Sequence, residues 1–290
     1  MKCVKPKQVD WNDDLSIYER DQWVAEIKYD GERNLLIVKD GEVKLQRHEG
    51  RDKTSFFPEV VEWAKKNIKV DCILDGESSV LLNWQKADFP SIANRQTDNP
   101  DKQNILLKTK PVTFVAFDIV ELKGKDVREE SFGERRKLLQ SLRLPKIEDF
   151  KENSVVIIDS GVCYHLDVIK AMVKELDLEG IVLKHPEFEN KYIKLKNYDE
   201  EEFEISGTNV TATGLKNGHC ISALELKNKD GRYVGDCTYI NNPQTEEFKK
   251  AVVGKKVLVR FMKTDAYRKG EGKLRFPVMQ KIMEEYSNAN

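Results

Sequence analysis

Short segments of alternating apolar and polar residues recur through the first two thirds of the chain, and this period of two predicts strands. The segments 35–38 and 43–46 are joined by Asp40-Gly41, a pair typical of a type I′ hairpin turn. Further strands are predicted at 72–74, 112–118, 155–158, 181–184 and 192–196, and the last two of these form a hairpin.

Apolar positions three or four residues apart predict helices between these strands. Pro58 begins one helix, whose apolar side chains within 60–68 recur at four-residue spacing. Ser131 and Glu134 form a capping box at the start of a second helix. A third, clearly amphipathic helix is predicted over 166–176. This mixture indicates an α+β domain of antiparallel sheets with helices.

Two polar stretches carry neither pattern. Residues 1–20 are predicted to form a loose lead-in, because Pro6 precludes a helix across them. Residues 83–111 contain three prolines and are predicted to be a long surface excursion with room for a helix.

The composition changes at 197–199, where five acidic residues follow within 199–204. We therefore predict two domains, 1–198 and 199–290. The second contains five strand-like runs, at 202–208, 220–226, 232–238, 256–262 and 274–279.

A helix is predicted between the third and fourth of these runs, with Asn242 as its cap, Pro243 in its first turn and Gly254 after its end. Five strands with a helix in that position resemble an OB-fold, a barrel that binds nucleic acids through its face and loops.

The composition is that of a globular protein with a heavily charged surface, since 39% of residues are hydrophobic and 34% are charged. No apolar run approaches the roughly 18 residues of a membrane span, and the N-terminal segment lacks the apolar core of a secretory signal. We expect a cytoplasmic monomer without a membrane partner. The five cysteines are scattered, which predicts reduced thiols and no zinc site.

Lys28 lies where a predicted strand ends, and Tyr29-Asp30-Gly31 follows it as a turn. An amine in that place can act as a nucleophile if its pKa is lowered, because only the unprotonated form attacks. The alternative is a surface lysine beside a hairpin turn. Two further lysines, Lys194 and Lys196, would lower the pKa of Lys28 by like-charge repulsion if they lay close to it.

The chain has no phosphate-cradling Gly-x-x-x-x-Gly-Lys loop, so side chains would have to hold a nucleotide. Five cations suit a triphosphate: Lys28, Arg33, Arg47, Lys194 and Lys196. Glu77 and Glu179, each at a predicted strand edge, are oxygen ligands suited to Mg²⁺. Lys194 and Lys196 could instead lie on a solvated face of a strand. Glu77 and Glu179 could instead be a pair of carboxylates that catalyse acid–base hydrolysis.

The stretch 28–33 resembles the signature Lys-x-Asp-Gly-x-Arg of the covalent nucleotidyltransferases, which comprise ATP-dependent DNA ligases, RNA ligases and mRNA capping enzymes. Elements that resemble the later motifs of this superfamily follow in its order: Arg47 with Gly50, Asp75-Gly76-Glu77, Phe117-Asp118, 179–184 and Lys194-Leu195-Lys196. Trp23 before Lys28 and Glu134-Arg135-Arg136 after Phe117-Asp118 make the segments around these motifs most similar to those of a small DNA ligase. The expected fold is a nucleotidyltransferase domain followed by an OB-fold barrel.

The resemblance implies a role for each matched residue. Lys28 would become the lysyl-AMP, and Asp30 would act at the nick. Arg33 and Glu77 would hold the ribose region, and Arg47 would bind phosphate or ribose.

The remaining matched residues complete the implied site. Phe117 would stack on the adenine, although an aromatic residue in an apolar strand is more often part of the core. Glu26 is a further nucleotide-binding candidate. Glu179 would bind the metal, and Lys194 and Lys196 would contact the α-phosphate.

The C-terminal part departs from the superfamily pattern. An Arg-x-Asp-Lys-like element that orients pyrophosphate is missing, which leaves Lys281 or Arg275 as candidates for that task. The second domain has no room for the large insertion with which small viral ligases surround DNA, and no room for a DNA-binding domain is expected before Lys28.

A basic run covers 255–281, where nine Lys or Arg residues face only two acidic residues, a surplus of seven positive charges. Such a run is either a solvated face or a phosphate-binding surface. The DNA-binding candidates are Lys255, Lys256, Arg260, Lys263, Arg268, Lys269, Lys273 and Arg275.

These observations predict an ATP-dependent DNA ligase that seals 3′-hydroxyl/5′-phosphate nicks in duplex DNA through lysyl-AMP and DNA-adenylate, using ATP and Mg²⁺ or Mn²⁺. The alternatives are an RNA ligase or a capping-type RNA guanylyltransferase, which share the lysine and the barrel, and a non-enzymatic OB-fold nucleic-acid-binding protein. The sequence does not distinguish DNA from RNA strands at the nick.

Overall fold

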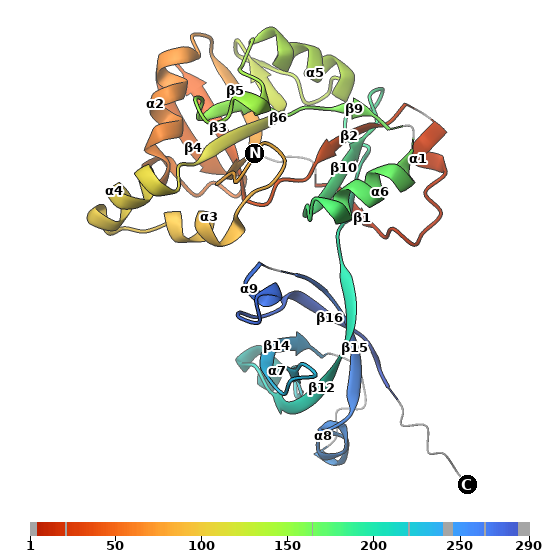
Figure 1. Ribbon diagram of the computed structural model, residues 1–290. Helices are drawn as coiled ribbons and strands as arrows, with labels where there is room; N and C mark the ends of the chain where they lie inside the picture. Colours follow the sequence, from red (N-terminus) through yellow and green to blue (C-terminus); the bar gives the residue numbers. More distant parts are fainter. Residues whose placement is uncertain are drawn as a thin grey trace. The chain divides into compact units, whose positions relative to one another are not determined.

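The computed structural model describes residues 5–20, 22–163, 165–219, 221–239, 246–263 and 265–283 (Figure 1). The chain divides into two compact units, Met1–Asn197 and Tyr198–Asn290. The described residues of the first unit form two sheets, and those of the second form a closed barrel.

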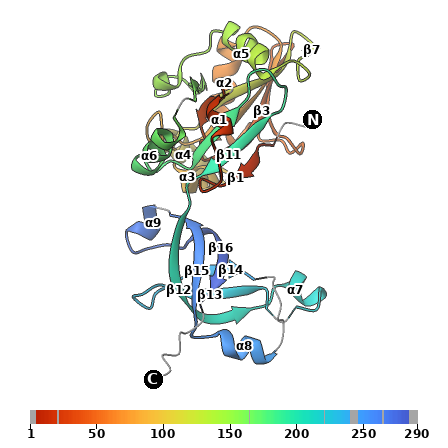
Figure 2. The same cartoon turned by 90° about the vertical axis from the view of Figure 1, so that its right-hand side faces the viewer.

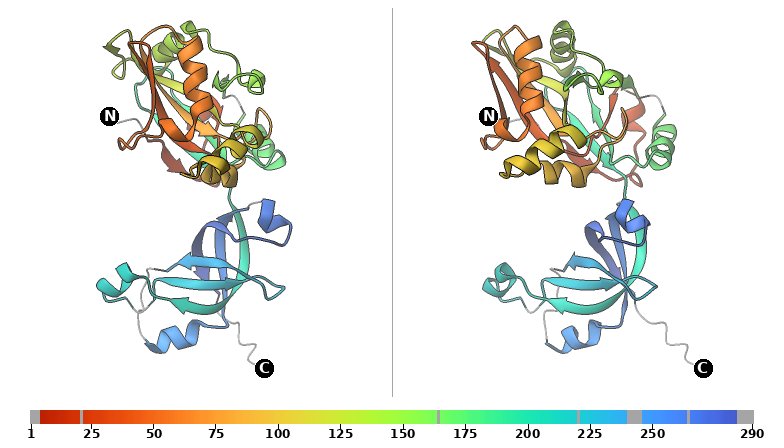
Figure 3. Two further views of the ribbon diagram at one scale, coloured as in Figure 1. Left: turned by 90° about the vertical axis from the view of Figure 1, so that its left-hand side faces the viewer. Right: turned by 60° about the vertical axis from the view of Figure 1, so that its left-hand side comes forward.

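The larger sheet of the first unit contains β3 (Glu32–Lys39), β4 (Glu42–Arg47), β5 (Cys72–Ser79), β6 (Thr113–Leu122), β7 (Lys125–Asp126) and β8 (Val155–Ile157). Its order is β4-β3-β5-β6-β7, with β8 paired in parallel to β6. Two helices, α2 (Pro58–Asn67) and α5 (Phe132–Ser141), pack on it and bury its apolar face, as Figure 3 shows for α2.

The smaller sheet contains β1 (Lys7–Val9), β2 (Val24–Ile27), β9 (Gly161–Val162), β10 (Gly180–Lys184) and β11 (Tyr192–Lys196), in the order β1-β11-β10-β2-β9. Trp23 and the inward side chains of β10 and β11 pack against α6 (Leu166–Glu175), whose Leu166 and Val173 are buried. The amphipathic helix and the hairpin predicted from the sequence are both confirmed.

Several local predictions are confirmed by backbone geometry. Asp40 and Gly41 have φ values of 51° and 77°, as a type I′ turn between β3 and β4 requires. The Ser131 side chain accepts a hydrogen bond from the Glu134 backbone N–H at the start of α5. Val60 and Ala64 are fully buried on α2.

Two predictions about local structure are wrong. Residues 1–20 are not a loose lead-in, because they contain β1 and α1 (Ile17–Arg20). β5 does not end before Asp75 but continues to Ser79, since β3 and β6 flank it along its whole length.

The excursion predicted over 83–111, with room for a helix, holds two helices, α3 (Phe89–Arg95) and α4 (Pro100–Thr109). Asp88 and Asn99 accept hydrogen bonds from backbone N–H groups at their first turns, and a proline follows in each case. The prolines therefore begin helices here, as their fixed φ allows. Two 3₁₀ turns, Thr54–Phe56 and Ile147–Asp149, complete the first unit.

The second unit is a closed barrel of strand order β12-β13-β14-β16-β15, which confirms the OB-like prediction (Figure 2). Its strands are β12 (Asp199–Asn209), β13 (Ala223–Lys227), β14 (Tyr233–Thr238), β15 (Lys256–Met262) and β16 (Arg275–Ile282), and its helices are α7 (Ala212–Lys216), α8 (Glu246–Val252) and α9 (Asp265–Arg268). The predicted helix between the third and fourth strands is α8; Asn242 and Pro243 lie outside the described residues. Gly254, with φ of 88°, follows its end.

Cys72, Cys163 and Cys237 are free and buried, and burial raises the pKa of their thiols to about 12, 11 and 11. Cys3 and Cys220 lie outside the described residues. Among the described residues, no helix is both long and apolar enough to cross a membrane.

Candidate active site

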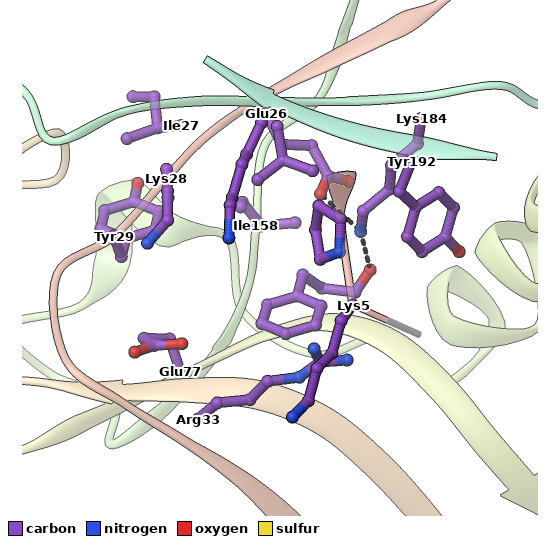
Figure 4. Close-up of a pocket in the computed structure, with 14 residues that line it drawn as sticks. Lys5, Glu26, Ile27, Lys28, Tyr29, Arg33, Glu77, Ile158, Lys184 and Tyr192 are labelled. Atoms are coloured by element: carbon purple, nitrogen blue, oxygen red, sulfur yellow. Dashed lines mark hydrogen bonds and ion pairs between the residues drawn. The ribbon is translucent and has the colours of Figure 1, made fainter. Parts of the chain in front are cut away.

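A cavity of about 280 Å³ lies between the two sheets of the first unit (Figure 4). One wall comes from β2, β10 and β11, and the other from β3, β5 and β6. Six of the predicted nucleotide-binding residues line it: Glu26, Lys28, Arg33, Glu77, Phe117 and Lys194. Side chains separated by more than 160 positions in the sequence therefore meet around one volume.

Lys28 follows β2 directly, and its backbone N–H donates to the carbonyl of Gly180 at 3.0 Å. The turn after it lies against β5. A Cβ atom on Gly31 would stand 2.3 Å from the Ser78 carbonyl oxygen and 3.0 Å from Cγ of Glu77. Glycine at this position is what lets the nucleophile turn approach the strand that carries Glu77.

Glu179 links Lys28 to the second lysine pair. Its Oε2 lies 2.6 Å from Nζ of Lys28, and its Oε1 lies 3.4 Å from Nζ of Lys196. Gly180, with φ of +148°, allows this placement, because a Cβ there would lie 2.1 Å from the Leu195 carbonyl oxygen. The Glu-Gly pair thus sets a carboxylate between two lysines.

The predicted lowering of the Lys28 pKa is wrong. Burial lowers the pKa of this amine, but attraction by Glu179 and Glu77 outweighs burial, so the pKa is raised. Lys194 is the lysine whose pKa is lowered, first by burial and then by repulsion from Lys196 and Lys28. The sequence motifs included Glu179 and Glu77, but they did not show how close these carboxylates lie to Nζ of Lys28, which is 2.6 Å for Glu179.

Glu77 stands beside Lys28 in the cavity wall. Burial raises the pKa of its carboxyl to about 8 against the attraction of Lys28, and the nearby Glu179 carboxylate adds to the rise. Two carboxylates that repel each other at a cavity edge are a donor set suited to a divalent cation. Among the described residues, no group of three or more His, Cys, Asp or Glu could hold a metal by itself.

Replacing Glu77 with Gln should remove a pH-dependent loss of stability. Between pH 4.5, the ordinary pKa, and about 8, the folded chain keeps the Glu77 proton that the unfolded chain releases, so stability falls as pH rises through this window. The melting temperature of Glu77→Gln minus that of wild type should grow by about 8 °C from pH 5 to pH 9 in a chelator.

The exposed carboxylate Glu62 on α2 provides the matched control, because Glu62→Gln should give a difference that does not change with pH. A constant difference for Glu77→Gln would show that Glu77 ionises normally in the folded protein.

Asp75 holds the guanidinium of Arg33 in place at the cavity wall. Asp75 receives two hydrogen bonds from this guanidinium, at 2.9 and 2.6 Å. The guanidinium also lies 5.4 Å from the centroid of the Phe117 ring. Asp75, of the Asp-Gly-Glu motif, therefore fixes Arg33, while Glu77 faces the cavity.

Four predicted residues do not line the cavity: Arg47, Lys196, Asp30 and Glu179, the last of which reaches it through its contact with Lys28. Arg47 ends β4, where its guanidinium lies 3.2 Å from Glu32. Lys196 faces Glu179, as described above, and Asp30 acts on the cavity through its charge, since it raises the pKa of both Lys28 and Glu77. Their roles in binding nucleotide stay predictions.

Sequence reasoning missed eight lining residues: Lys5, Pro6, Ile27, Tyr29, Ile158, Val182, Lys184 and Tyr192. Lys5 and Pro6 were missed because the parallel pairing of β1 with β11 was not foreseen. Lys184 carried a usable signal: it alternates with Val182 on one face of β10, and a lysine at an inward strand position is rarely buried without a partner.

The basic run of the second unit is partly neutralised in space. β12 pairs with β15, which places the acidic run beside the basic one. Arg260 lies 2.7 Å from Glu200, and Lys263 lies 2.7 Å from Glu201. Lys256 also pairs with an acid of β12, at 3.8 Å. The surplus of seven charges in the sequence therefore overstates the charge that this face offers a phosphate backbone.

The architecture is that of the nucleotidyltransferase-type ligases, with two sheets around a lysine-bearing cavity and a separate OB-like barrel. The chain belongs to the family of ATP-dependent DNA ligase domains, whose family model matches residues 3–197.

Two curated relatives come from Bacillus subtilis. The bifunctional non-homologous end joining protein LigD is 34% identical over 68% of this chain and 36% of its own length. The SPbeta prophage-derived DNA ligase-like protein LigB is 28% identical over 66% of this chain and 67% of its own length. The chain thus spans about a third of the first relative.

Two solved structures share the fold. A Lig E DNA ligase, described as binding DNA with a minimal scaffold, superposes with a TM-score of 0.66 at 17% identity, covering 97% of this chain and 100% of that one. A mycobacterial DNA ligase D complexed with ATP and MES gives a TM-score of 0.53 at 20% identity, covering 97% and 95%.

Proposed function

We propose that this chain is an ATP-dependent ligase that seals 3′-hydroxyl/5′-phosphate nicks in duplex DNA. The observation that carries the proposal is the position of Lys28, whose Nζ faces a cavity between two carboxylates and a set of cations. Membership of the ATP-dependent DNA ligase domain family supports it. A hydrolase would not need a lysine at this point.

The reaction proceeds in three displacements at phosphorus. Nζ of Lys28 attacks the α-phosphorus of ATP, a P–N bond forms and pyrophosphate leaves, while Glu179 is the nearest acceptor for the proton that Nζ loses. A 5′-phosphate oxygen at the nick then displaces Lys28 and takes the AMP. The 3′-hydroxyl finally attacks this activated phosphate, closes the strand and releases AMP.

Each part of ATP has candidate contacts in the cavity. The Phe117 ring offers a flat face to the purine, and one carboxylate oxygen of Glu26 has no hydrogen-bond partner within the described protein, so it can accept a hydrogen bond from an amine. Lys194 is suited to the α-phosphate, because its charge is not paired with a carboxylate in the described residues. Arg33 remains the candidate for the ribose.

Glu77 and Glu179 would hold a divalent cation such as Mg²⁺ or Mn²⁺ together with phosphate oxygens and water, because the described residues contain no group of three side chains that could hold it alone. A bound cation would neutralise charge that develops on the phosphates. The two carboxylates hold the proton on Lys28 when they are ionised, so their state controls the nucleophile.

Two assays test the proposal. Labelled ATP should form a covalent adduct with the chain and labelled GTP should not, whereas a capping-type guanylyltransferase would show the reverse and a non-enzymatic OB-fold protein would form neither. Sealing of DNA, RNA and hybrid nicks then separates a DNA ligase from an RNA ligase. Sealing of RNA nicks alone would contradict the proposal.

DNA contact by the second unit should be salt-sensitive and carried by the basic residues that no acid neutralises. Lys269 and Lys273 are exposed and have no ion-pair partner among the described residues. Each neutralised phosphate contributes about −0.9 to the slope of log affinity against log salt. Lys269→Ala with Lys273→Ala should therefore flatten the slope for nick binding by about two units and leave lysyl-AMP formation intact.

A matched control removes a paired charge from the same barrel. Glu200→Gln with Arg260→Gln deletes one ion pair at no change in net charge, and its slope should equal that of wild type. Equal slopes for all three proteins would assign the exposed lysines to a solvated surface.

A further inference from the structure

A lysine without an assigned role is buried in the wall of the cavity. The side chain of Lys184 is 3% exposed, and its Nζ lies 2.7 Å from Oε2 of Glu26. It also donates to the backbone carbonyl of Phe117 at 3.0 Å (Figure 4). One ammonium group therefore holds the two residues that offer the purine a polar acceptor and a flat face.

Aromatic rings enclose this ammonium group. Its Nζ lies 4.8 Å from the centroid of the Phe117 ring, 4.7 Å from that of Phe132 and 5.3 Å from that of Tyr192. Ring faces favour a cation at these distances. A buried ammonium group is costly unless such rings and a carboxylate surround it, so the three rings and Glu26 offset the cost of burying Lys184.

The two carboxylate oxygens of Glu26 differ in their contacts. Oε2 of Glu26 is bound by Lys184, whereas buried Oε1 has no hydrogen-bond partner among the described residues; the nearest cation is Nη1 of Arg136, at 3.9 Å. The Glu26 side chain is 2% exposed and lines the cavity. An unpartnered buried oxygen at a cavity wall is a place for a donor on a ligand.

We propose that Lys184 is a positioning residue that sets the choice of nucleobase, because its ammonium group binds Oε2 of Glu26 and leaves Oε1 facing the cavity as an acceptor. This inference rests on the proposed use of ATP. An ionised carboxylate accepts from the exocyclic amine of adenine and repels the carbonyl oxygen that guanine carries at the same ring position. A protonated carboxyl can donate to that carbonyl, so loss of ionisation would admit guanine.

The charges that face Glu26 fix the direction of the effect. Burial raises the pKa of Glu26, Lys184 and Arg136 oppose the rise, and Asp118 adds to it. The pKa of Glu26 is raised even so, with burial as the largest cause, and loss of the Lys184 charge would raise it further. Loss of Lys184 would therefore favour the protonated carboxyl, and a higher pH would oppose that change.

The experiment compares Lys184→Met with wild type between pH 6 and pH 9, using kcat/KM for covalent adduct formation with ATP and with GTP, and the Kd of α,β-methylene ATP and α,β-methylene GTP. The wild-type preference for ATP should be constant with pH. In Lys184→Met it should fall at least tenfold at pH 7, mainly through KM, and recover toward pH 9 as Glu26 ionises. Lys184→Arg should retain the preference.

Two further variants test whether the effect comes from the Glu26–Lys184 pair. The double variant Glu26→Gln with Lys184→Met replaces both charged groups with neutral ones, so its preference for ATP over GTP should be weak at every pH. The same variant can be used if Lys184→Met alone does not fold. Lys191→Met is the matched control, because Lys191 is an exposed lysine beside β11 that also lies over aromatic rings but lines no cavity. It should behave as wild type.

A Lys184→Met protein that keeps the wild-type preference for ATP overturns the proposal. The proposal is also overturned if kcat/KM for adduct formation falls equally for ATP and GTP at every pH, because that result indicates only a structural role. Failure of the proposed function looks different: wild-type protein would then form an adduct with GTP instead of ATP, or would form no adduct with either nucleotide.

Discussion

Lys28→Ala protein should form no covalent AMP adduct and seal no nicks, yet should remain folded. The amine is the one nucleophile that the cavity places between Glu179 and Glu77, and alanine cannot form the P–N bond. Radiolabel from ATP retained on the denatured protein should therefore drop to background.

Structure is maintained in this variant because the Lys28 side chain is 24% exposed and Glu179 keeps a second lysine, Lys196, at 3.4 Å. Thermal unfolding of Lys28→Ala should stay cooperative. Lys44→Ala, an exposed lysine on the neighbouring β4, is the matched control and should label as wild type. Labelling of Lys28→Ala at wild-type level would remove Lys28 from the nucleophile's role.

Glu179→Ala should lose adduct formation by about a hundredfold or more while it binds nicked DNA as wild type does. The structural argument separates two roles of this carboxylate. Glu179 raises the pKa of Lys28, so its removal should lower that pKa and increase the fraction of unprotonated amine. A strong loss in spite of this gain would identify metal and phosphate binding as the essential task of Glu179.

The measurements are single-turnover adduct formation across pH and across Mg²⁺ concentration, with nick binding at one salt concentration. Glu175→Ala, which removes an exposed carboxylate at the end of α6, should match wild type in both. Faster adduct formation by Glu179→Ala would show that the carboxylate only restrains the nucleophile. Equal losses of adduct formation and DNA binding would indicate a folding defect.

Tight packing explains why the motifs Lys-x-Asp-Gly and Glu-Gly contain the glycines Gly31 and Gly180. Gly31 and Gly180 each have no space for a Cβ atom, since backbone oxygens would lie 2.3 and 2.1 Å away. These close approaches bring the nucleophile turn onto β5 and Glu179 onto β11. The glycines of the Lys-x-Asp-Gly and Glu-Gly pairs thus follow from packing as much as from chemistry.

The sequence by itself determined the architecture and six of the fourteen residues that line the cavity. Alternating apolar positions indicated the strands that the two sheets contain, and turn residues such as Asp40-Gly41 set a hairpin register through their local φ preference. Motif order selected six of the cavity residues correctly. These features could be predicted because each depends on residues within a few positions of one another.

Tertiary structure alone decided the electrostatics. The direction of the Lys28 pKa shift depends on Glu179, 151 positions away in the sequence, and the free charge of the barrel depends on the pairing of β12 with β15. Lys184 gained a possible role only when β10 placed it beside Glu26 and Phe117. Coulomb energies vary with distance and with burial, and a sequence contains neither quantity until the chain has folded.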